Sequence, residues 1–196
     1  MGRIMKLYVI RHPQPIGAEG ICYGQTDLDI SDEALAEGSA SLSGLLESKP
    51  IDMVYSSPLI RCHKLAFALS NDLCLALQTE PLLVEMDFGI WEGLLWDEID
   101  RQAFDEWMAD YVNNAPPAGE NFQTVLDRVN SLIGELKERG QEEVALVTHA
   151  GVIRALLAVV LNIPVDSCWR FSVNYNSLLT FRIGEEAYQN RLLSLI

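Results

Sequence analysis

Short apolar runs alternate with longer helical patterns along the chain. Residues 6–10, 51–55 and 144–147 form compact runs with β-branched and aromatic members, and polar or small residues follow each run. Continuous apolar runs of this length are typical of strands that are buried on both faces of a parallel sheet. The pattern therefore predicts three inner strands that end in polar loops.

Two longer segments carry a helical pattern. Within residues 122–136 the apolar side chains recur every three or four positions, which predicts an amphipathic helix, and Asn121 is placed to cap it. The segment VIRALLAVVLN after Gly151 is apolar nearly all round. It predicts a buried helix packed against the sheet and ending before Pro164.

The alternation of strands and helices predicts an α/β fold, a three-layer α/β/α sandwich with a mainly parallel sheet. Residues 177–183 and 188–195 flank a GEE turn and predict a C-terminal hairpin at one side of that sheet. The length of 196 residues predicts a single domain over residues 1–196, with 113–121 as a loop over a site. Ligands of open α/β sheets bind beyond the carboxyl ends of the strands, so the polar loops should converge.

The charge of the chain limits its partners. Its 28 acidic and 14 basic side chains give a formal charge of −14. Because such a charge repels nucleic acid and anionic membranes, we expect a small-molecule ligand and neither of those partners. The N-terminal apolar run is too short for a signal peptide or a membrane span, which predicts a cytoplasmic protein. Whether two copies form a homodimer is left open.

The cysteines indicate no metal or redox chemistry. They are scattered without a CxxC pair and match neither a zinc site nor a thioredoxin-like motif, so we expect reduced thiols in or near the core. Their positions are Cys22, Cys62, Cys74 and Cys168. The chain also lacks a carboxylate cluster with magnesium-like spacing, and we predict neither a metal ion nor another cofactor.

Basic side chains follow the predicted strands. Arg11 and His12 come directly after the first strand, Arg61 follows the SSPL turn after the second, and His149 follows the run VALVT. Two guanidinium groups can hold phosphate oxygens while a neutral imidazole attacks phosphorus in line and a second imidazole binds the equatorial charge. A histidine pKa of about 6.5 leaves an unprotonated nitrogen near neutral pH. The set predicts phosphoryl transfer through His12.

Two further groups complete this hypothesis. The helix that starts near Gly151 would offer backbone N–H groups to the same anion. Glu85, in PLLVEMDFGIWEG, is the best-placed acid to protonate a departing alkoxide, ahead of Asp87 and Glu92. Taken singly, each of these residues is more often a surface or loop side chain, as we expect for His63, and only their joint placement favours a site.

Four ordered motifs, YVIRHPQP, YSSPLIRC, VEMDFGIWEG and LVTHAG, resemble those of the histidine phosphatase superfamily, the phosphoglycerate-mutase-like group. The resemblance covers most of the chain. It implies that His12 is the phosphorylated nucleophile, that Arg11, Arg61 and His149 form the phosphate pocket, and that Glu85 is the proton donor.

Within this superfamily, GICYGQTDLDIS, FGIWEG, WDEI and PPAGENF are similar to the alpha-ribazole phosphatase branch, which removes the 5'-phosphate of alpha-ribazole phosphate in cobalamin assembly. The resemblance implies that the run CYGQTD, with Tyr23 and Gly24, contributes to substrate binding and shapes a nucleoside pocket through Tyr23. A turn built on Gly24 and Asp27 is an interpretation of at least equal weight. The chain departs from the common RHGET and its following asparagine, and has Ala18 at the place of that asparagine. We expect Gln14 to donate a hydrogen bond instead.

Other functions fit parts of the pattern. A phosphoglycerate mutase or a sugar-phosphate phosphatase would use the same His12 chemistry, but a mutase must bind a diacid, and no further basic cluster is evident. An inactive protein that binds a phosphorylated ligand would be expected to lose the nucleophile or an arginine. Because the set is intact, the sequence favours a hydrolase.

Overall fold

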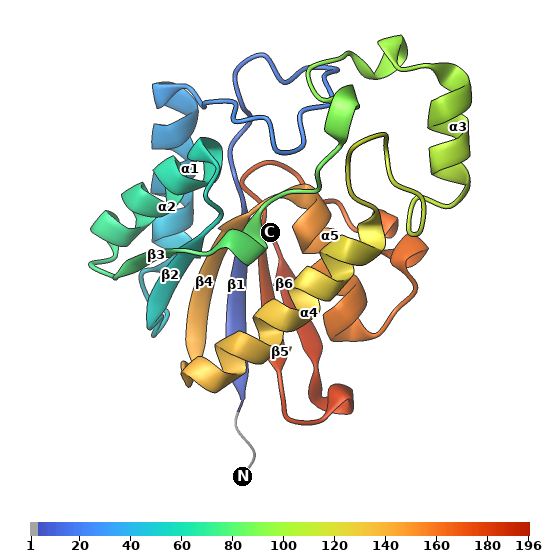
Figure 1. Cartoon of the computed structure of the whole chain (residues 1–196). Helices are drawn as coiled ribbons and strands as arrows, with labels where there is room; N and C mark the ends of the chain where they lie inside the picture. The colour runs from blue at the N-terminus through green and yellow to red at the C-terminus, as the bar shows by residue number, and fades with distance from the viewer. Residues whose placement is uncertain (1–3) are drawn as a thin grey trace.

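The computed structural model describes residues 4–196. Its strands form one six-stranded sheet in the order β3-β2-β4-β1-β5-β6 (Figure 1). Strands β3, β2, β4 and β1 are parallel, whereas β5 runs antiparallel to β1 and β6 antiparallel to β5. The predicted α/β fold, with a mainly parallel sheet and a C-terminal hairpin, is confirmed. The strands are β1 Met5–Arg11, β2 Met53–Ser56, β3 Leu77–Thr79, β4 Glu143–Thr148, β5 Leu178–Ile183 and β6 Arg191–Leu195.

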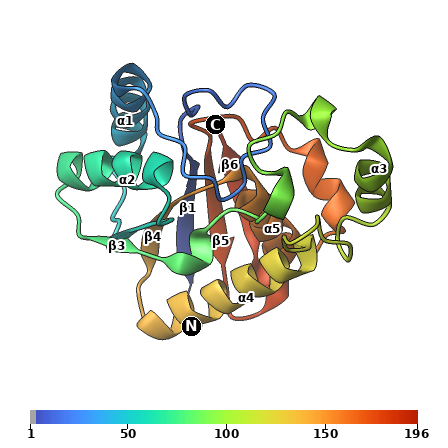
Figure 2. The ribbon, with the colours of Figure 1, turned by 45° about the horizontal axis from the view of Figure 1, so that its top comes forward.

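Helices cover both faces of the sheet (Figure 2). The side chains of Tyr8 and Ile10 on β1 pack in the core under α1 and α2, while Leu7 and Val9 pack in the core under α4 and α5. Successive side chains of a strand point to opposite faces, so one buried strand serves both layers. The α-helices are α1 Asp32–Leu46, α2 Ile60–Asp72, α3 Arg101–Ala109, α4 Phe122–Arg139 and α5 Ala150–Leu161. Short 3-10 turns lie at Pro81–Leu83, Gly89–Trp91, Trp96–Glu98, Val165–Arg170 and Ala187–Gln189.

The two predicted helices form with the expected ends. The side chain of Asn121 accepts a hydrogen bond from the Thr124 backbone N–H and caps α4, which continues to Gly140. Gly140 has φ +82°, a left-handed conformation that glycine adopts without a steric penalty and that commonly ends a helix. Helix α5 is buried along most of its length and ends at Asn162, before Pro164.

Several predicted boundaries were wrong by a few residues. The second strand begins at Met53 rather than residue 51, and β6 begins at Arg191 rather than residue 188, because a 3-10 turn follows the GEE segment. The edge strand β3 was not predicted, since three residues of which two are exposed carry no apolar run. Cys74 is exposed, contrary to the prediction of core thiols, which Cys22, Cys62 and Cys168 satisfy.

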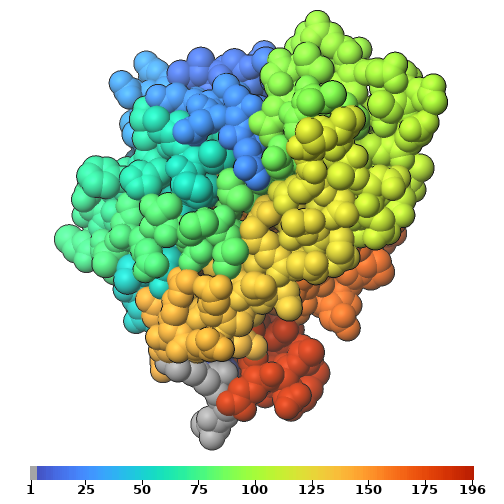
Figure 3. All heavy atoms as spheres, viewed as in Figure 1, coloured from blue at the N-terminus to red at the C-terminus, as the bar shows by residue number. Residues whose placement is uncertain are grey.

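The segment after β1 and the segment from residue 84 to 121 lie beyond the carboxyl ends of the strands (Figure 1). Their surfaces meet in the space-filling view (Figure 3). Ile21 and Leu95 form an isolated antiparallel bridge, and Cys22 exchanges backbone hydrogen bonds with Leu94 and Gly93. A small core of Cys22, Trp91 and Ile99 lies beneath this contact. The segments therefore build a wall above the sheet. No helix within residues 4–196 is long and apolar enough to cross a membrane.

Candidate active site

His12 lies at the carboxyl end of β1 with 1% of its surface exposed. Its Nδ1 is 2.6 Å from the Pro13 carbonyl oxygen. Because a carbonyl only accepts hydrogen bonds, Nδ1 carries the proton in the neutral ring, and the lone pair remains on Nε2. Nε2 is therefore the ring nitrogen that is available to attack an electrophile.

His149 follows β4 and lies next to His12. The two ring centroids are 5.1 Å apart, and His149 Nε2 is 2.7 Å from the Ser57 Oγ. The register of the sheet explains this proximity, because Arg11 of β1 pairs with Thr148 of β4 and the His12 backbone N–H donates to the Thr148 carbonyl. Residues that directly follow paired parallel strands emerge side by side. The two histidines meet for this reason.

Both imidazoles are held in the neutral form. Burial lowers the pKa of the His12 ring well below its usual value, and the Arg61 and Arg11 guanidinium groups lower it further, against an upward effect of the Pro13 carbonyl. Burial also lowers the pKa of His149, followed by the effect of His12 and the arginines. A depressed pKa keeps the His12 lone pair free at neutral pH.

Arg11, the last residue of β1, and Arg61, in the first turn of α2, both lie close enough to His12 to act on its charge. Arg11 donates from Nη1 to the Val173 carbonyl at 2.7 Å. Arg61, which is fully buried at the start of α2, donates to the carbonyls of Gly24 at 2.6 Å and Thr26 at 2.7 Å. The Nε atom of each arginine is buried without a hydrogen-bond partner. Each guanidinium thus keeps donor capacity that an anion can use.

Glu85 reaches the start of α5. Its Oε2 accepts a hydrogen bond from the Gly151 backbone N–H at 3.1 Å, and its Oε1 accepts from Met86 N–H at 3.0 Å. A Cβ at position 151 would collide with the Glu85 carboxylate, so this close approach requires glycine. Gly24 has φ +33°, and a Cβ there would collide with Glu92 and the Met86 carbonyl. Both glycines predicted at the site have a steric reason to be glycine.

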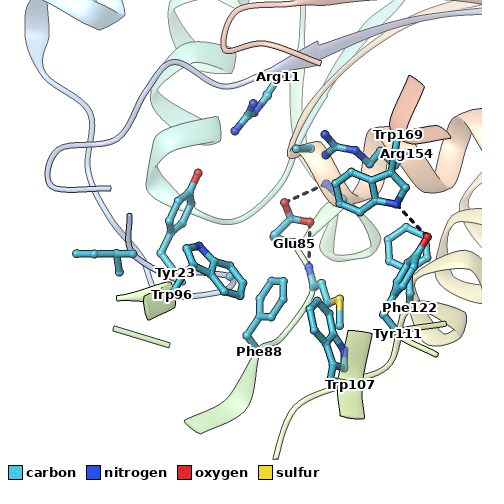
Figure 4. A pocket seen from close by; sticks show the side chains of 15 residues that line it. Arg11, Tyr23, Glu85, Phe88, Trp96, Trp107, Tyr111, Phe122, Arg154 and Trp169 are labelled. Carbon is cyan, nitrogen blue, oxygen red and sulfur yellow. Dashed lines mark hydrogen bonds between the residues drawn. The ribbon is translucent and has the colours of Figure 1, made fainter. Parts of the chain in front are cut away.

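A cavity of about 200 Å³ opens at these residues (Figure 4). Arg11, Tyr23, Gly24, Glu85 and Gly151 line it, and all five were predicted as site residues. The fully or almost fully buried His12, Arg61 and His149 lie directly behind this lining, since Arg61 bonds Gly24 and His12 adjoins Arg11. Most of the remaining lining is aromatic, namely Phe88, Trp96, Trp107, Tyr111, Phe122 and Trp169.

Gln14 is a predicted site residue that the structure does not bring to the cavity. It is exposed and lines a separate hollow near the start of α1. The neighbouring prolines explain the displacement, because Pro13 is buried against Gly38 and Pro15 pairs with Ile30 in an isolated bridge. The side chain between them turns outward. The geometry therefore does not support the prediction that Gln14 donates the hydrogen bond that the family's asparagine gives to phosphate.

The weaker acid candidates stabilise loops. The Glu92 carboxylate accepts hydrogen bonds from the backbone of Gln25, Thr26 and Phe88, and Asp87 accepts from the Gly89 backbone. Neither carboxylate lines the cavity, whereas Glu85 does, so Glu92 and Asp87 hold their loops in place away from a bound ester. His63, expected to be exposed, is half-buried on α2.

Tyr175 was not predicted and lies over the basic groups. Its ring centroid is 3.9 Å from the Arg11 Cζ and 5.7 Å from the His12 ring, and its hydroxyl is 3.2 Å from that of Tyr23. Tyr23 in turn lies 5.0 Å from the Arg61 Cζ. The two tyrosines hold the guanidinium planes by cation–π contact. The sequence carried no signal for Tyr175, which comes from an irregular loop before β5.

Arg128 of α4 was also missed, and it positions the Glu85 segment. Its Nη1 forms an ion pair with Glu120 at 2.8 Å, and its Nη2 donates to the Val84 carbonyl at 2.9 Å. Arg128 is on the inner half of an amphipathic helix, where a half-buried arginine usually has a specific partner. Its helical position one turn after Val125 was the available signal.

We expect Arg128→Met to lower kcat/KM for an alkyl phosphate by about 10-fold, because the segment that carries Glu85 loses its anchor and a small displacement of a catalytic group is costly. Steady-state kinetics would measure this. Arg139→Met is the matched control on the same helix: it removes the ion pairs with Glu80 and Glu135 far from the cavity and should leave kcat/KM unchanged. Equal kinetic losses in the two variants would contradict the positioning role.

Comparison with known proteins agrees with this geometry. Residues 7–195 match the histidine phosphatase superfamily (branch 1). The chain belongs to this superfamily. The family and its fold, predicted from the four motifs, are thereby confirmed.

Similar proteins within the superfamily are named as phosphatases. The chain is 27% identical to a putative phosphoserine phosphatase 2 of Hydrogenobacter thermophilus, over 95% of this chain and 96% of that protein. It is 28% identical to the adenosylcobalamin/alpha-ribazole phosphatase of Escherichia coli, over 97% and 96%. A solved mycobacterial glucosyl-3-phosphoglycerate phosphatase superposes with a TM-score of 0.85 at 26% identity, covering 97% of this chain and 98% of that one. The predicted enzyme class, a phosphatase, agrees with these relatives.

Proposed function

We propose that the protein hydrolyses small-molecule phosphomonoesters through a phosphohistidine at His12. The observation that carries this proposal is the buried cluster of His12, Arg11, Arg61 and His149, in which the Pro13 carbonyl engages the His12 Nδ1 and leaves Nε2 free. Nε2 attacks phosphorus while the bond from phosphorus to the ester oxygen breaks, and Glu85 gives its proton to the departing alkoxide. Water then attacks the phosphohistidine, with Glu85 taking up a proton, and phosphate leaves.

The arginines supply the electrostatic part of this mechanism. A chain with a formal charge of −14 repels a phosphate dianion unless cations are concentrated locally. Arg11 and Arg61 keep free donors beside His12, and the low exposure of this pocket strengthens their attraction for the transferring oxygens. The backbone N–H groups at the start of α5 add to this positive potential.

Activity should not depend on a divalent metal, because the arginines already supply the positive charge that a metal would. Within residues 4–196 no three histidine, cysteine, aspartate or glutamate side chains are grouped so as to hold a metal ion. We expect incubation with EDTA, followed by gel filtration, to leave the rate on a chromogenic phosphate ester unchanged. A loss of activity that added Mg²⁺, Mn²⁺ or Zn²⁺ restores would contradict this prediction.

For the substrate, alpha-ribazole 5'-phosphate is the proposal that the motif resemblance favours. The Escherichia coli relative is named for alpha-ribazole, and the aromatic wall of the cavity suits a planar base. The other similar proteins are named for phosphoserine and for glucosyl-3-phosphoglycerate, whose phosphate esters carry a carboxylate. An unpaired arginine in the cavity, Arg154, favours this second class.

The test is a comparison of kcat/KM across alpha-ribazole 5'-phosphate, O-phosphoserine, 3-phosphoglycerate and a chromogenic ester. Release of inorganic phosphate supports the hydrolase, whereas interconversion of 2- and 3-phosphoglycerate without release supports a mutase. Binding of phosphate esters without turnover of any ester would show an inactive phospho-ligand-binding protein and end the proposal. A small-molecule phosphomonoester as the ligand, without nucleic acid or a membrane surface, remains our proposal for the partner.

A further inference from the structure

Arg154 of α5 lines the cavity and has a free guanidinium. Its Cζ lies 4.2 Å from the centroid of the Trp169 ring. Within residues 4–196 no hydrogen bond or ion pair engages its side chain, and its Nε is shielded from solvent without a partner. The buried Nε–H lacks an acceptor, which is costly, and a ligand in the cavity can supply one.

The surroundings of Arg154 keep it unpaired. Trp169 donates its indole N–H to the Tyr111 hydroxyl at 2.9 Å, and that hydroxyl donates to Asp166 at 2.9 Å. The Asp166 carboxylate, on the same 3-10 turn as Trp169, is thus engaged by Tyr111 and not by Arg154. This chain of hydrogen bonds fixes the indole as a platform, and the platform holds the guanidinium at the cavity wall by cation–π contact.

The position of Arg154 relative to Glu85 indicates what it can bind. Gly151 donates to the Glu85 carboxylate, and Arg154 is three residues later, so both lie on one face of α5 about one helical turn apart. Figure 4 shows Glu85 in the middle of the cavity, with Tyr23 and Trp96 on one side and Arg154 and Trp169 on the other. A leaving group whose ester oxygen meets Glu85 can therefore extend toward Arg154.

We infer that Arg154 is a specificity-determining residue that binds a carboxylate on the leaving group, a few bonds from the ester oxygen. A guanidinium takes both oxygens of a carboxylate in a bidentate pair, and the cation–π contact with Trp169 limits the orientations open to this guanidinium. The inference rests on the proposed hydrolase function and, of the two substrate classes proposed there, favours phosphorylated hydroxy or amino acids over alpha-ribazole 5'-phosphate. From the sequence, no further basic cluster was evident that could bind a second anionic group of the substrate. That interpretation missed Arg154.

Matched pairs of esters test this inference, because 3-phosphoglycerate differs from glycerol 3-phosphate only by a carboxylate in place of CH₂OH, and O-phosphoserine differs from phosphoethanolamine only by the carboxylate. We expect the wild type to favour the carboxylate member of each pair by about 10- to 100-fold in kcat/KM, the range of a charge-assisted hydrogen bond. The preference should appear mainly in KM, since the carboxylate is bound equally in the ground and transition states.

Variants of Arg154 separate recognition from other roles. In Arg154→Met, the ratio of kcat/KM for the carboxylate ester to kcat/KM for its partner should fall close to one in both pairs. The kcat/KM for glycerol 3-phosphate should stay within about 2-fold of wild type. Arg154→Lys should keep part of the preference because it keeps the charge but not the bidentate fork. Arg170→Met is the matched control, since Arg170 is a nearby exposed arginine that does not line the cavity, and it should keep the full preference.

Equal loss on both members of a pair would overturn the inference and assign Arg154 to the phosphate or to Glu85. An absence of preference in the wild type, or a higher kcat/KM for alpha-ribazole 5'-phosphate than for either carboxylate ester, would also overturn it. The chromogenic ester separates these outcomes from failure of the proposed function: if it is hydrolysed, only the inference fails. If Arg154→Met does not fold by circular dichroism, Arg154→Gln, which also removes the charge, gives the same comparison.

Discussion

Replacing His12 by alanine is expected to lower the hydrolysis of a chromogenic phosphate ester by more than about 10³-fold, because the proposed nucleophile is lost. The side chain is almost fully buried, so the variant should first be shown to melt cooperatively. Steady-state release of the chromophore measures the effect. With a ³²P-labelled ester, the wild type should carry acid-labile label after quenching, and His12→Ala should carry none.

The remaining histidine outside the site provides the control. His63 is half-buried on α2, and His63→Ala should keep the wild-type rate and the label. Equal rates for His12→Ala and the wild type would end the phosphohistidine mechanism. Loss of turnover with full retention of the label would place the covalent bond on another residue.

Replacing Glu85 by glutamine is expected to lower kcat/KM by about 10²-fold or more for an alkyl phosphate and much less for p-nitrophenyl phosphate. An alkoxide needs the proton in the transition state, whereas nitrophenolate leaves without it. Glutamine retains one oxygen to accept from the Gly151 or Met86 backbone N–H, so the local geometry is partly conserved. A series of esters with leaving groups of increasing basicity would show a steeper dependence in the variant than in the wild type.

The dependence of kcat/KM on leaving-group basicity distinguishes proton donation by Glu85 from a positioning role. An equal loss for every ester would show that Glu85 only orients the pocket. Asp97→Asn, a change at an exposed carboxylate in the segment after Glu85, should alter neither the rates nor the slope. The Arg128→Met variant should resemble Glu85→Gln in its slope if the anchor acts through Glu85.

The inner strands of the sheet could be predicted because strands that are buried on both faces have continuous apolar runs in the sequence. β1 and β4 are covered on both faces by helices, so their central residues form continuous apolar runs, LYVI in β1 and VALV in β4. The edge strand β3 is half covered and only three residues long, and its pairing with β2 depends on backbone hydrogen bonds that no side-chain pattern announces. The start of β6 was also misplaced, because a 3-10 turn at Ala187–Gln189 precedes this strand.

The candidate site could be predicted where a residue directly follows a buried strand. His12 and His149 meet because β1 and β4 pair in parallel register, and this outcome follows from two apolar runs and the residues after them. The prediction that Gln14 binds the substrate was wrong, because the path of its loop depends on the contacts of the flanking prolines with α1 and Ile30. Tyr175 and Arg128 were missed because their partners come from distant parts of the chain.

By itself the sequence determined the α/β class, the inner strands, the amphipathic helix α4 and the chemical types of the proposed phosphate-binding groups. These follow from local periodicity and from the residues that end each strand. Only the tertiary structure decided that Tyr175 lies over Arg11, that Arg128 anchors the Glu85 segment, and that Arg154 faces the cavity without a partner. The physical reason is that the environment of a side chain is set by elements far away in the sequence, whereas periodicity reports only whether a position is buried.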